Sequence, residues 1–223
     1  MDVETYAAKE LAGASAGWIA ARAEPAVEER GRFTLAVSGG STPAAMFAAL
    51  ARLDLPWSKV HVFQVDERVA PDGDPDRNLN DLRANLLDLV PVVAHLMDVT
   101  AADLSEAAQR YAAEISDVTG DGVLDVVHLG LGDDGHTASW PPGDPVINVR
   151  DQDVAITQPY RGRVRMTLTV PAVNRARDVM FLAAGDGKRA MVKRLVARDH
   201  TIPSSHVRDD ATVLVDEAAA ADL

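Results

Sequence analysis

The sequence contains no cysteine and no apolar run long enough to cross a membrane. The absence of cysteine among its 223 residues excludes disulfide bonds and thiol catalysis, and it fits a reducing compartment. The longest uncharged apolar stretch, residues 11–21, is too short to span a bilayer. The first residues, Met1 to Glu4, are acidic, unlike the basic start of a signal peptide. We therefore expect a cytoplasmic protein with no membrane partner.

Positive charge is also scarce. The chain has 22 Lys and Arg residues against 34 Asp and Glu residues, which gives a formal net charge of −12 and a pI near 4.8. Such a charge argues against nucleic acid or an anionic membrane surface as a general partner. A small substrate that carries a phosphate would need a local basic pocket within this acidic molecule. The sequence leaves the oligomeric state open.

Strand and helix patterns alternate along the chain. Apolar strands are predicted at residues 33–37, 60–65, 123–129, 179–184 and 212–215, and a half-exposed strand at 163–170. Helices are predicted at residues 4–22, after Pro43, at 103–118 with Thr100 as the cap, and from 188 to about 198. This alternation predicts an α/β fold, with residues 1–223 forming a single domain around a mostly parallel sheet with helices on both faces.

The loop at residues 129–139 carries the most chemistry. It follows a predicted strand and contains Gly130, Gly132 and Gly135. Glycines let the backbone amides approach a ligand closely. Asp134 and His136 are set into the same bend, and a carboxylate beside an imidazole can move protons. The loop therefore predicts an active site.

These glycines also fit the G-x-G-x-x-G fingerprint of dinucleotide-binding proteins, but their context does not. That fingerprint needs a long helix that opens at the third glycine. Here Pro141 and Pro142 follow within two turns, and only the first turn of a helix tolerates proline. The motif also lies past the middle of the chain. We therefore disfavour an NAD site.

Polar or glycine-bearing segments follow four of the predicted strands, at residues 38–42, 66–68, 130–136 and 185–188. Ligands bind beyond the carboxyl ends of the strands in an open parallel sheet. If the four strands are parallel, these segments share one rim.

The turn after the strand at residues 33–37 predicts an anion site. It consists of Ser38, Gly39, Gly40, Ser41 and Thr42. With Thr42 as the cap and Pro43 as the first helical residue, the free amides of the helix start would face a ligand. An ordinary strand-to-helix turn is an equal alternative. No Walker-type lysine follows, so a nucleoside triphosphate is not expected.

Basic candidates for neutralising a phosphate are Arg68 and Lys188, although each alone is more often a solvated surface cation. Arg161, Arg163 and Arg165 alternate, so a strand would place all three on one face. That row could bind the substrate anion or could be a solvated face.

Asp66 and Glu67 adjoin each other, so at most one of them is expected to face the ligand. We take Asp66 as the candidate for acid–base work and expect Glu67 to pair with an arginine. Of the six histidines, only His136 lies in a glycine loop. The others are predicted to be packed (His61 and His128) or to lie on the surface (His95, His200 and His206).

Two further patterns are discounted. The G-x-S-x-G at residues 13–17 lies in an alanine-rich helix with no strand before it, so no serine nucleophile is expected there. Residues 72–78 alternate like a calcium loop, but Arg77 and Arg83 occupy the places of the required glycine and glutamate. No histidine pair has the spacing of a helical zinc site. We predict no required metal.

Five segments together resemble the 6-phosphogluconolactonase family of the pentose phosphate pathway. They are residues 37–43, 65–68, 130–139, 163–171 and 185–188. The run D-G-H-T-A-S at residues 134–139 is the most specific part. One departure is visible, because Trp140 and Pro141 stand where lactonases usually have leucine and phenylalanine. We expect this change to reshape the wall of the pocket.

The resemblance implies a modified Rossmann-like sheet and hydrolysis of 6-phospho-D-glucono-1,5-lactone to 6-phosphogluconate without a cofactor. It implies that the phosphate lies on the turn at residues 38–42 beside Arg68 and Lys188. The candidate general base is His136, assisted by Asp134 or Asp66. Arg163 and Arg165 remain candidates for binding the substrate.

The same resemblance suggests the loop amides from Gly132 to Gly135 as oxyanion donors and leaves two alternatives open. One is a glucosamine-6-phosphate deaminase, which carries a similar D-G-H element with a different continuation. The other is a non-catalytic sugar-phosphate sensor on the same fold, although no basic helix-turn-helix segment is present.

Overall fold

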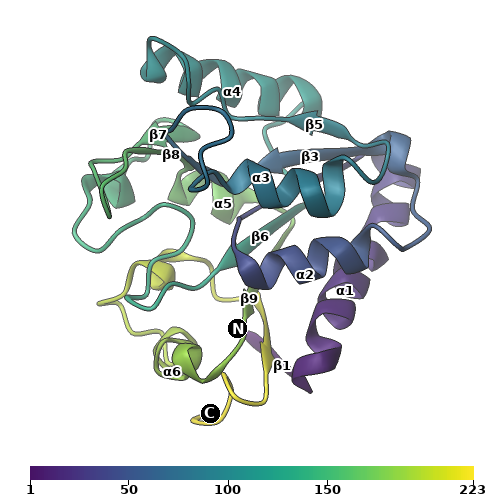
Figure 1. Ribbon diagram of the computed structural model, residues 1–223, viewed down its shortest axis with the longest axis vertical. Coiled ribbons are helices and arrows are strands. Elements are labelled where there is room, and N and C mark those ends of the chain that lie inside the picture. Colours follow the sequence, from purple (N-terminus) through teal and green to yellow (C-terminus); the bar gives the residue numbers. More distant parts are fainter.

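The computed structural model describes all 223 residues, Met1 to Leu223, and its centre is a seven-stranded sheet (Figure 1). The strand order is β1-β10-β9-β6-β2-β3-β5, and every pairing is parallel. The strands are β1 (Asp2–Tyr6), β2 (Phe33–Val37), β3 (Val60–Gln64), β5 (Val93–His95), β6 (Val126–Gly130), β9 (Asp178–Ala183) and β10 (Thr212–Asp216). The predicted α/β fold with a mostly parallel sheet is confirmed.

Helices cover both faces of this sheet, as the alternation of elements predicted (Figure 1). On one face lie α1 (Ala8–Arg30), α2 (Ser41–Leu50) and α3 (Asn78–Leu82), the last continuing as one π-helical segment, Arg83–Leu87. On the other face lie α4 (Leu104–Thr119), α5 (Val170–Arg175) and α6 (Arg189–Val196). Short 3-10 turns occur at Trp57–Lys59, Pro145–Asn148, Asp186–Lys188 and Pro203–His206.

The two layers of the core follow from the period-two alternation of the strands. In β6, Val126 belongs to the cluster under α1 and α2, whereas Val127 and Leu129 belong to the opposite cluster. Strand β3 divides in the same way, with Val62 on one side and Phe63 on the other. Buried on both faces, these strands are nearly continuous in apolar residues.

A small antiparallel sheet joins the main one at the carboxyl end of β2. Its order is β4 (Asp66–Arg68), β8 (Arg165–Leu168) and β7 (Val154–Ile156). Val65 links the two sheets, because its amide donates to Val37 at 2.9 Å and its carbonyl accepts from Leu168 at 2.8 Å. Val65 therefore holds the small sheet against the carboxyl end of β2.

Several element boundaries differ from the prediction because tertiary contacts decide them. The expected helix at 4–22 begins with β1, whose partner is the distant strand β10, and α1 then runs past Pro25 to Arg30. The cap of α4 is Asp103, which accepts from the amide of Glu106 at 3.0 Å, and not Thr100.

Two other expectations were wrong in detail. The strand predicted at 163–170 is shorter and antiparallel, and α5 takes its last residue. Helix α2 begins at Ser41 with Gly40 as its cap, so Pro43 is the third helical residue and not the first.

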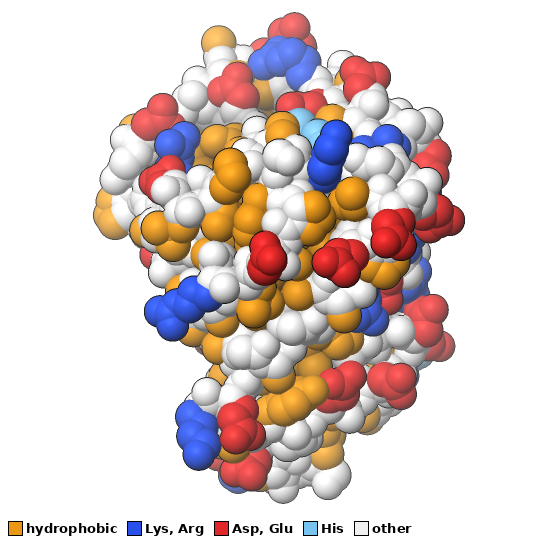
Figure 2. Space-filling view, turned by 90° about the vertical axis from the view of Figure 1, so that its right-hand side faces the viewer, with side chains coloured by type: hydrophobic (Ala, Val, Ile, Leu, Met, Phe, Trp, Pro, Cys, Tyr) orange, Lys and Arg blue, Asp and Glu red, His pale blue; other side chains and the backbone are white.

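No helix is both long and apolar enough to cross a lipid bilayer. Figure 2 views the molecule from the side of α1 and α2, where small apolar side chains occupy the middle of the face and charges of both signs surround them. Lys and Arg are scattered among Asp and Glu there, so this face presents no continuous basic patch.

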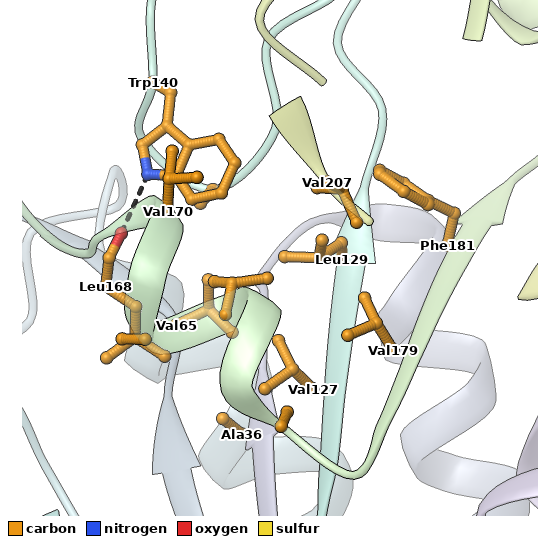
Figure 3. Close-up of a cluster of buried hydrophobic side chains, with 14 of the residues drawn as sticks. Ala36, Val65, Val127, Leu129, Trp140, Leu168, Val170, Val179, Phe181 and Val207 are labelled. Carbon is orange, nitrogen blue, oxygen red and sulfur yellow. Dashed lines mark hydrogen bonds between the residues drawn. The ribbon is translucent and has the colours of Figure 1, made fainter. Parts of the chain in front are cut away.

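Trp140 lies in the core and not in the pocket wall that we expected it to reshape. Its side chain is fully buried, and its indole N–H donates to the carbonyl of Leu168 at 2.8 Å (Figure 3). The ring belongs to the same buried cluster as Val170 at the start of α5 (Figure 3). The departure from the family pattern is therefore accommodated by packing beneath the site.

Trp140 gives the first testable prediction. We expect Trp140→Ala to lower the free energy of unfolding by about 3–5 kcal/mol through the cavity it leaves. Trp140→Phe should cost about 1–3 kcal/mol, because the buried Leu168 carbonyl loses its donor. As a control, Trp57→Phe removes a similar bond, 3.2 Å to the Leu53 carbonyl, at a half-buried site, and should cost less. Urea unfolding of the three variants measures this ranking, and equal losses would contradict it.

His128 on β6 makes stability depend on pH. The side chain is fully buried against Phe47, and burial lowers the pKa of its imidazole from 6.5 to about 3. Between these two values the unfolded chain binds more protons than the folded chain. This residue should therefore reduce stability as the pH falls below 6.5, by up to about 1.4 kcal/mol per pH unit. His128→Gln should flatten the slope measured by denaturant unfolding, whereas the exposed His200→Gln should leave it unchanged.

Candidate active site

A pocket of about 200 Å³ opens at the carboxyl ends of the central strands. It collects residues from the ends of β2, β6 and β9 in the main sheet and from β4 and β8 in the small one. The lining consists of Ser38, Gly39, Asp66, Arg68, Asn78, Gly130, Leu131, Gly132, Asp133, His136, Thr137, Ala138, Arg161, Arg165 and Lys188. The four polar segments of the sequence thus converge on one rim, although β4 belongs to the antiparallel sheet and reaches the rim by way of Val65.

The glycine loop brings His136 and Asp134 into contact. His136 Nδ1 lies 2.5 Å from Asp134 Oδ1, and the amide of His136 donates to the same oxygen at 3.1 Å. A Cβ on Gly132 would overlap the imidazole, so only glycine at that position lets the ring lie against the backbone. With Nδ1 engaged by the carboxylate, Nε2 remains the free nitrogen of a residue that lines the pocket.

The loop is a tight turn and not a helix start. The amide of Gly132 donates to the His136 carbonyl at 2.8 Å, and that of Gly135 donates to the Gly132 carbonyl at 3.1 Å. Gly135 has φ +81°, and a Cβ there would press on Ile202. No helix follows, which fits the decision against an NAD site. The amides of Gly132 and Gly135 are thus engaged within the turn, so of the loop amides expected as oxyanion donors those of Asp133 and Asp134 stay candidates.

Asp134 is held in its charged form. Burial alone would raise its pKa, but hydrogen bonds from the Tyr160 hydroxyl and from His136 outweigh burial and lower that pKa well below the ordinary value. A carboxylate at this place can keep the proton of the imidazole on Nδ1. The pair is therefore arranged as a general base with an orienting carboxylate.

Asp66 and Glu67 point to different sides of β4, as expected from adjacent strand residues. Asp66 lines the pocket, is 5% exposed, and accepts a hydrogen bond of 2.6 Å from the Ser139 hydroxyl. Ser139 in turn lies 3.4 Å from the guanidinium of Arg165. Asp66 is thus tied to the cationic side of the site.

Glu67 is fully buried behind the pocket. Its carboxylate accepts hydrogen bonds of 2.8–2.9 Å from the Gln64 side chain and from the amides of Arg68, Asn78 and Leu79. It also pairs with Arg77, 3.3 Å away and 4% exposed. Glu67 pairs with an arginine, as expected, and its position fixes the pocket wall instead of facing a ligand.

Cations face the pocket from both sheets. Arg68 and Arg165 are direct partners across β4 and β8, and each has an Nε that is buried without a hydrogen-bond partner. Burial lowers the pKa of Arg165; the Asp66 carboxylate offsets part of this effect, and the neighbouring Arg68 adds to it. Two like charges directly opposite each other are unfavourable in a sheet unless an anion lies between them. Lys188 contributes a further positive charge from the turn after β9.

Some predicted residues are not brought to the pocket. Arg163 pairs with Asp74 and Asp76, each at 3.0 Å, because the chain turns before β8 and separates it from Arg165. Ser41 and Thr42 line a separate hollow beside α1, since α2 begins at Ser41 and turns their side chains that way. Two glycines also lie off the lining, Gly40 as the cap of α2 and Gly135 inside the turn.

Other residues of the site were missed by the sequence analysis. Asn78 lines the pocket, and its side chain donates to the Asp66 carbonyl at 3.0 Å. Tyr160 was missed as well, and its hydroxyl donates to Asp134 of the glycine loop. Arg161, by contrast, belongs to the predicted row of arginines; it lines the pocket and pairs with Asp133. The segment Y-R-G-R carries one usable signal, because glycine in the second central position is typical of a two-residue hairpin turn. No local pattern marks Asn78.

Asp133, Asp134 and His136 place their oxygen and nitrogen atoms within 4.8 Å of one another, a grouping that could hold a metal ion. Each carboxylate already has partners. Asp133 pairs with Arg161 at 2.8 Å, which lowers its pKa, and Asp134 binds His136 and Tyr160. The geometry is that of a hydrogen-bonded network.

The remaining histidines divide almost as expected. His128 is buried, and His200 and His206 are exposed. His95, predicted on the surface, is 7% exposed, because it stacks on Phe63 and bonds to His61 at 2.9 Å. The strand β5 that carries it is too short for its pattern to be recognised.

The two patterns discounted in the sequence, residues 13–17 and 72–78, take part in contacts within the fold. Ser15 is buried in α1 and donates to the Leu11 carbonyl at 2.8 Å, so it is no nucleophile elbow. The aspartates of the calcium-like loop pair with arginines, Asp72 with Arg77 and Asp74 with Arg163.

Comparisons with known proteins agree with this geometry. A family model described as glucosamine-6-phosphate isomerases/6-phosphogluconolactonase matches residues 6–215. The 6-phosphogluconolactonase of Synechocystis is 40% identical over 187 residues, covering 80% of this chain and 78% of its own. That of Nostoc is 35% identical, covering 92% and 90%. The crystal structure of 6-phosphogluconolactonase from Thermotoga maritima superposes with a TM-score of 0.86 at 26% identity, covering 96% of this chain and 98% of that one.

Glu67 provides a prediction for the site. We expect Glu67→Gln to lower the free energy of unfolding by about 3–5 kcal/mol, because Arg77 loses its buried counter-charge and an NH2 group faces backbone donors. The matched control is Asp72→Asn, which removes the exposed partner of the same arginine, 84% exposed, and should cost at most about 1 kcal/mol. Chemical denaturation compares the two, and similar losses would contradict the role of Glu67.

Proposed function

Because the chain belongs to the family of glucosamine-6-phosphate isomerases and 6-phosphogluconolactonases, we propose that it hydrolyses 6-phospho-D-glucono-1,5-lactone to 6-phosphogluconate in this pocket. The chain is a lactone hydrolase, a 6-phosphogluconolactonase, by its identity of 35–40% with such enzymes over most of its length. The single observation that carries the mechanism is a histidine with a free Nε2 at the pocket and a charged carboxylate on Nδ1.

The reaction begins at His136. Its Nε2 takes a proton from a water molecule, and the oxygen of that water attacks the lactone carbonyl carbon. The imidazolium so formed is stabilised by Asp134 on Nδ1. The tetrahedral intermediate then collapses, the bond from carbon to the ring oxygen breaks, and the ring oxygen receives the proton from Nε2. The product is an open-chain carboxylic acid, which ionises at neutral pH.

The oxyanion of the intermediate needs positive charge or donors close to His136. The amides of Gly132 and Gly135 are engaged within the turn. We assign this role to Arg165, with the amides of Asp133 and Asp134 as further candidates. Arg165 and His136 both line the pocket and both contact Tyr160, the guanidinium carbon at 5.0 Å and the imidazole centroid at 5.5 Å from the centre of its ring. The buried, unpaired Nε of Arg165 is supporting evidence for a substrate oxygen as partner.

The phosphate of the substrate is assigned to the cations on the other side of Arg165. Arg68 and Lys188 supply the counter-charges there, and Ser38 with Gly39 provides the backbone turn. Asp66 is held by Ser139 and is suited to orient the attacking water or a hydroxyl of the sugar. Ser41, Thr42 and Arg163 have no place in this arrangement.

The proposal treats residues 1–223 as a single sugar-phosphate lactonase domain. It also includes a cytoplasmic location, which a chain without cysteine fits. No cofactor takes part in the steps described above.

The test is a coupled assay in which the lactone is generated in situ and 6-phosphogluconate is followed by a dehydrogenase, with spontaneous hydrolysis subtracted. We expect His136→Asn to lower kcat by about 10²–10⁴-fold with little change in KM, because it removes the base. Arg68→Ala should instead raise KM, because it weakens phosphate binding.

The matched controls are an exposed histidine and an exposed arginine outside the pocket, His200→Asn and Arg110→Ala, which should behave as the wild type. A folded wild-type protein without lactone acceleration would contradict the proposal. Ammonia release from glucosamine 6-phosphate, or tight binding without turnover, would then identify the deaminase or the sensor.

A further inference from the structure

Tyr160 reaches the pair of His136 and Asp134 from outside the glycine loop. Its hydroxyl donates a hydrogen bond to Asp134 Oδ2, while His136 Nδ1 engages Oδ1 at 2.5 Å. The rings of Tyr160 and His136 meet edge to face, with centroids 5.5 Å apart and planes at 69°. Tyr160 therefore contacts both partners without lining the pocket.

A two-residue turn fixes the place of Tyr160. Tyr160 and Arg163 exchange backbone hydrogen bonds of 2.9 and 3.2 Å around Arg161 and Gly162. Both central residues have positive φ, 50° and 80°, as the tightest hairpin turns require. This turn directs the tyrosine back over the glycine loop.

Arginines on the same hairpin hold the ring in position. The guanidinium carbons of Arg161 and Arg165 lie 5.2 Å and 5.0 Å from the centroid of Tyr160. Arg161 also pairs with Asp133 at 2.8 Å, beside Asp134 on the glycine loop. The ring is therefore fixed by contacts that do not involve its hydroxyl.

The hydroxyl of Tyr160 acts as a donor and keeps its proton. Burial, followed by the hydrogen bond to the Asp134 carboxylate, raises its pKa to about 12. Asp134 is held ionised by the same contact. At neutral pH one oxygen of the carboxylate is thus committed to tyrosine and the other to histidine.

We propose that Tyr160 is a positioning residue of the lactonase reaction, whose hydroxyl fixes the Asp134 carboxylate so that His136 keeps its proton on Nδ1 and presents Nε2 to the substrate. The assignment rests on the proposed function. Without the hydroxyl Oδ2 loses its hydrogen bond, and the orientation of the carboxylate depends on the His136 contacts at Oδ1 alone, so Oδ1 and Oδ2 compete for the imidazole.

The decisive variant is Tyr160→Phe, which keeps the ring and its contacts and removes one oxygen. We expect kcat to fall about 5- to 50-fold with KM nearly unchanged. The acid limb of the pH profile of kcat/KM should move to higher pH, because a carboxylate without the tyrosine donor attracts the imidazolium more strongly. A purely structural role would not move that limb.

Two further measurements separate positioning from other effects. In an Asp134→Asn background, Tyr160→Phe should have almost no additional effect on kcat, because the residue acts through Asp134. Tyr6→Phe is the matched control, since the Tyr6 hydroxyl also donates to a carboxylate, Glu4 at 2.5 Å, on an edge strand outside the pocket. Its kinetics should equal those of the wild type.

A Tyr160→Phe protein with wild-type kcat and pH profile would overturn the proposal, and so would an undiminished loss in the Asp134→Asn background. A wild-type protein without lactonase activity would instead contradict the proposed function. The contact itself has a readout independent of turnover, the ¹⁵N NMR signal of His136 Nδ1–H. This signal should change in Tyr160→Phe and stay in place in Tyr6→Phe, and an unchanged signal would also count against the proposal.

Discussion

The buried carboxylate of Glu67 joins the parts of the molecule that enclose the pocket. It accepts from Gln64 at the end of β3, from Arg68 on β4, and from the first two amides of α3. Both oxygens of a buried carboxylate need hydrogen-bond donors, because no water is present to supply them. The groups that donate to Glu67 are therefore restricted to one arrangement around it. Main sheet, small sheet and helix are thereby fixed relative to one another, and Arg77 balances the charge.

The position of the cations depends on this arrangement. Arg68 follows Glu67 directly and stands opposite Arg165, so a shift of β4 would move both guanidinium groups relative to the base. His136 is positioned independently, by the tight turn in which Gly132 leaves space for its ring. The base His136 is therefore held by the glycine loop, whereas Arg68 is held by β4. The hairpin that carries Tyr160 and Arg165 contacts both of these segments.

The parts of the fold that depend on local pattern could be predicted from the sequence. Strands such as residues 33–37 carry their own apolar signal, and the rule for parallel sheets then places their ends on one rim. Strands β1, β5 and β7 could not be found in this way, because they are short edge or small-sheet strands that are defined by distant partners.

The site follows the same division. His136 and Asp134 are two residues apart, so their contact is local and readable from the loop. Tyr160 reaches Asp134 across 26 positions, and Asn78 reaches Asp66 across 12, so neither contact leaves a trace in spacing. The prediction that Arg161, Arg163 and Arg165 share one strand face was wrong for a related reason. Positive φ at Arg161 and Gly162 breaks the strand, and alternation no longer places Arg163 and Arg165 on one side.

The charge of the protein and the charge of its pocket have opposite signs, and distance decides which one the substrate meets. The net charge of −12 is spread over the surface, where salt screens it beyond about 8–10 Å. Inside the pocket Arg68, Arg165 and Lys188 act at contact distance and in partly buried surroundings, where each interaction is stronger. The opposed arginines repel each other, and an anionic substrate bound between them offsets that repulsion. The residues that repel each other across the small sheet therefore favour a ligand with negative charge.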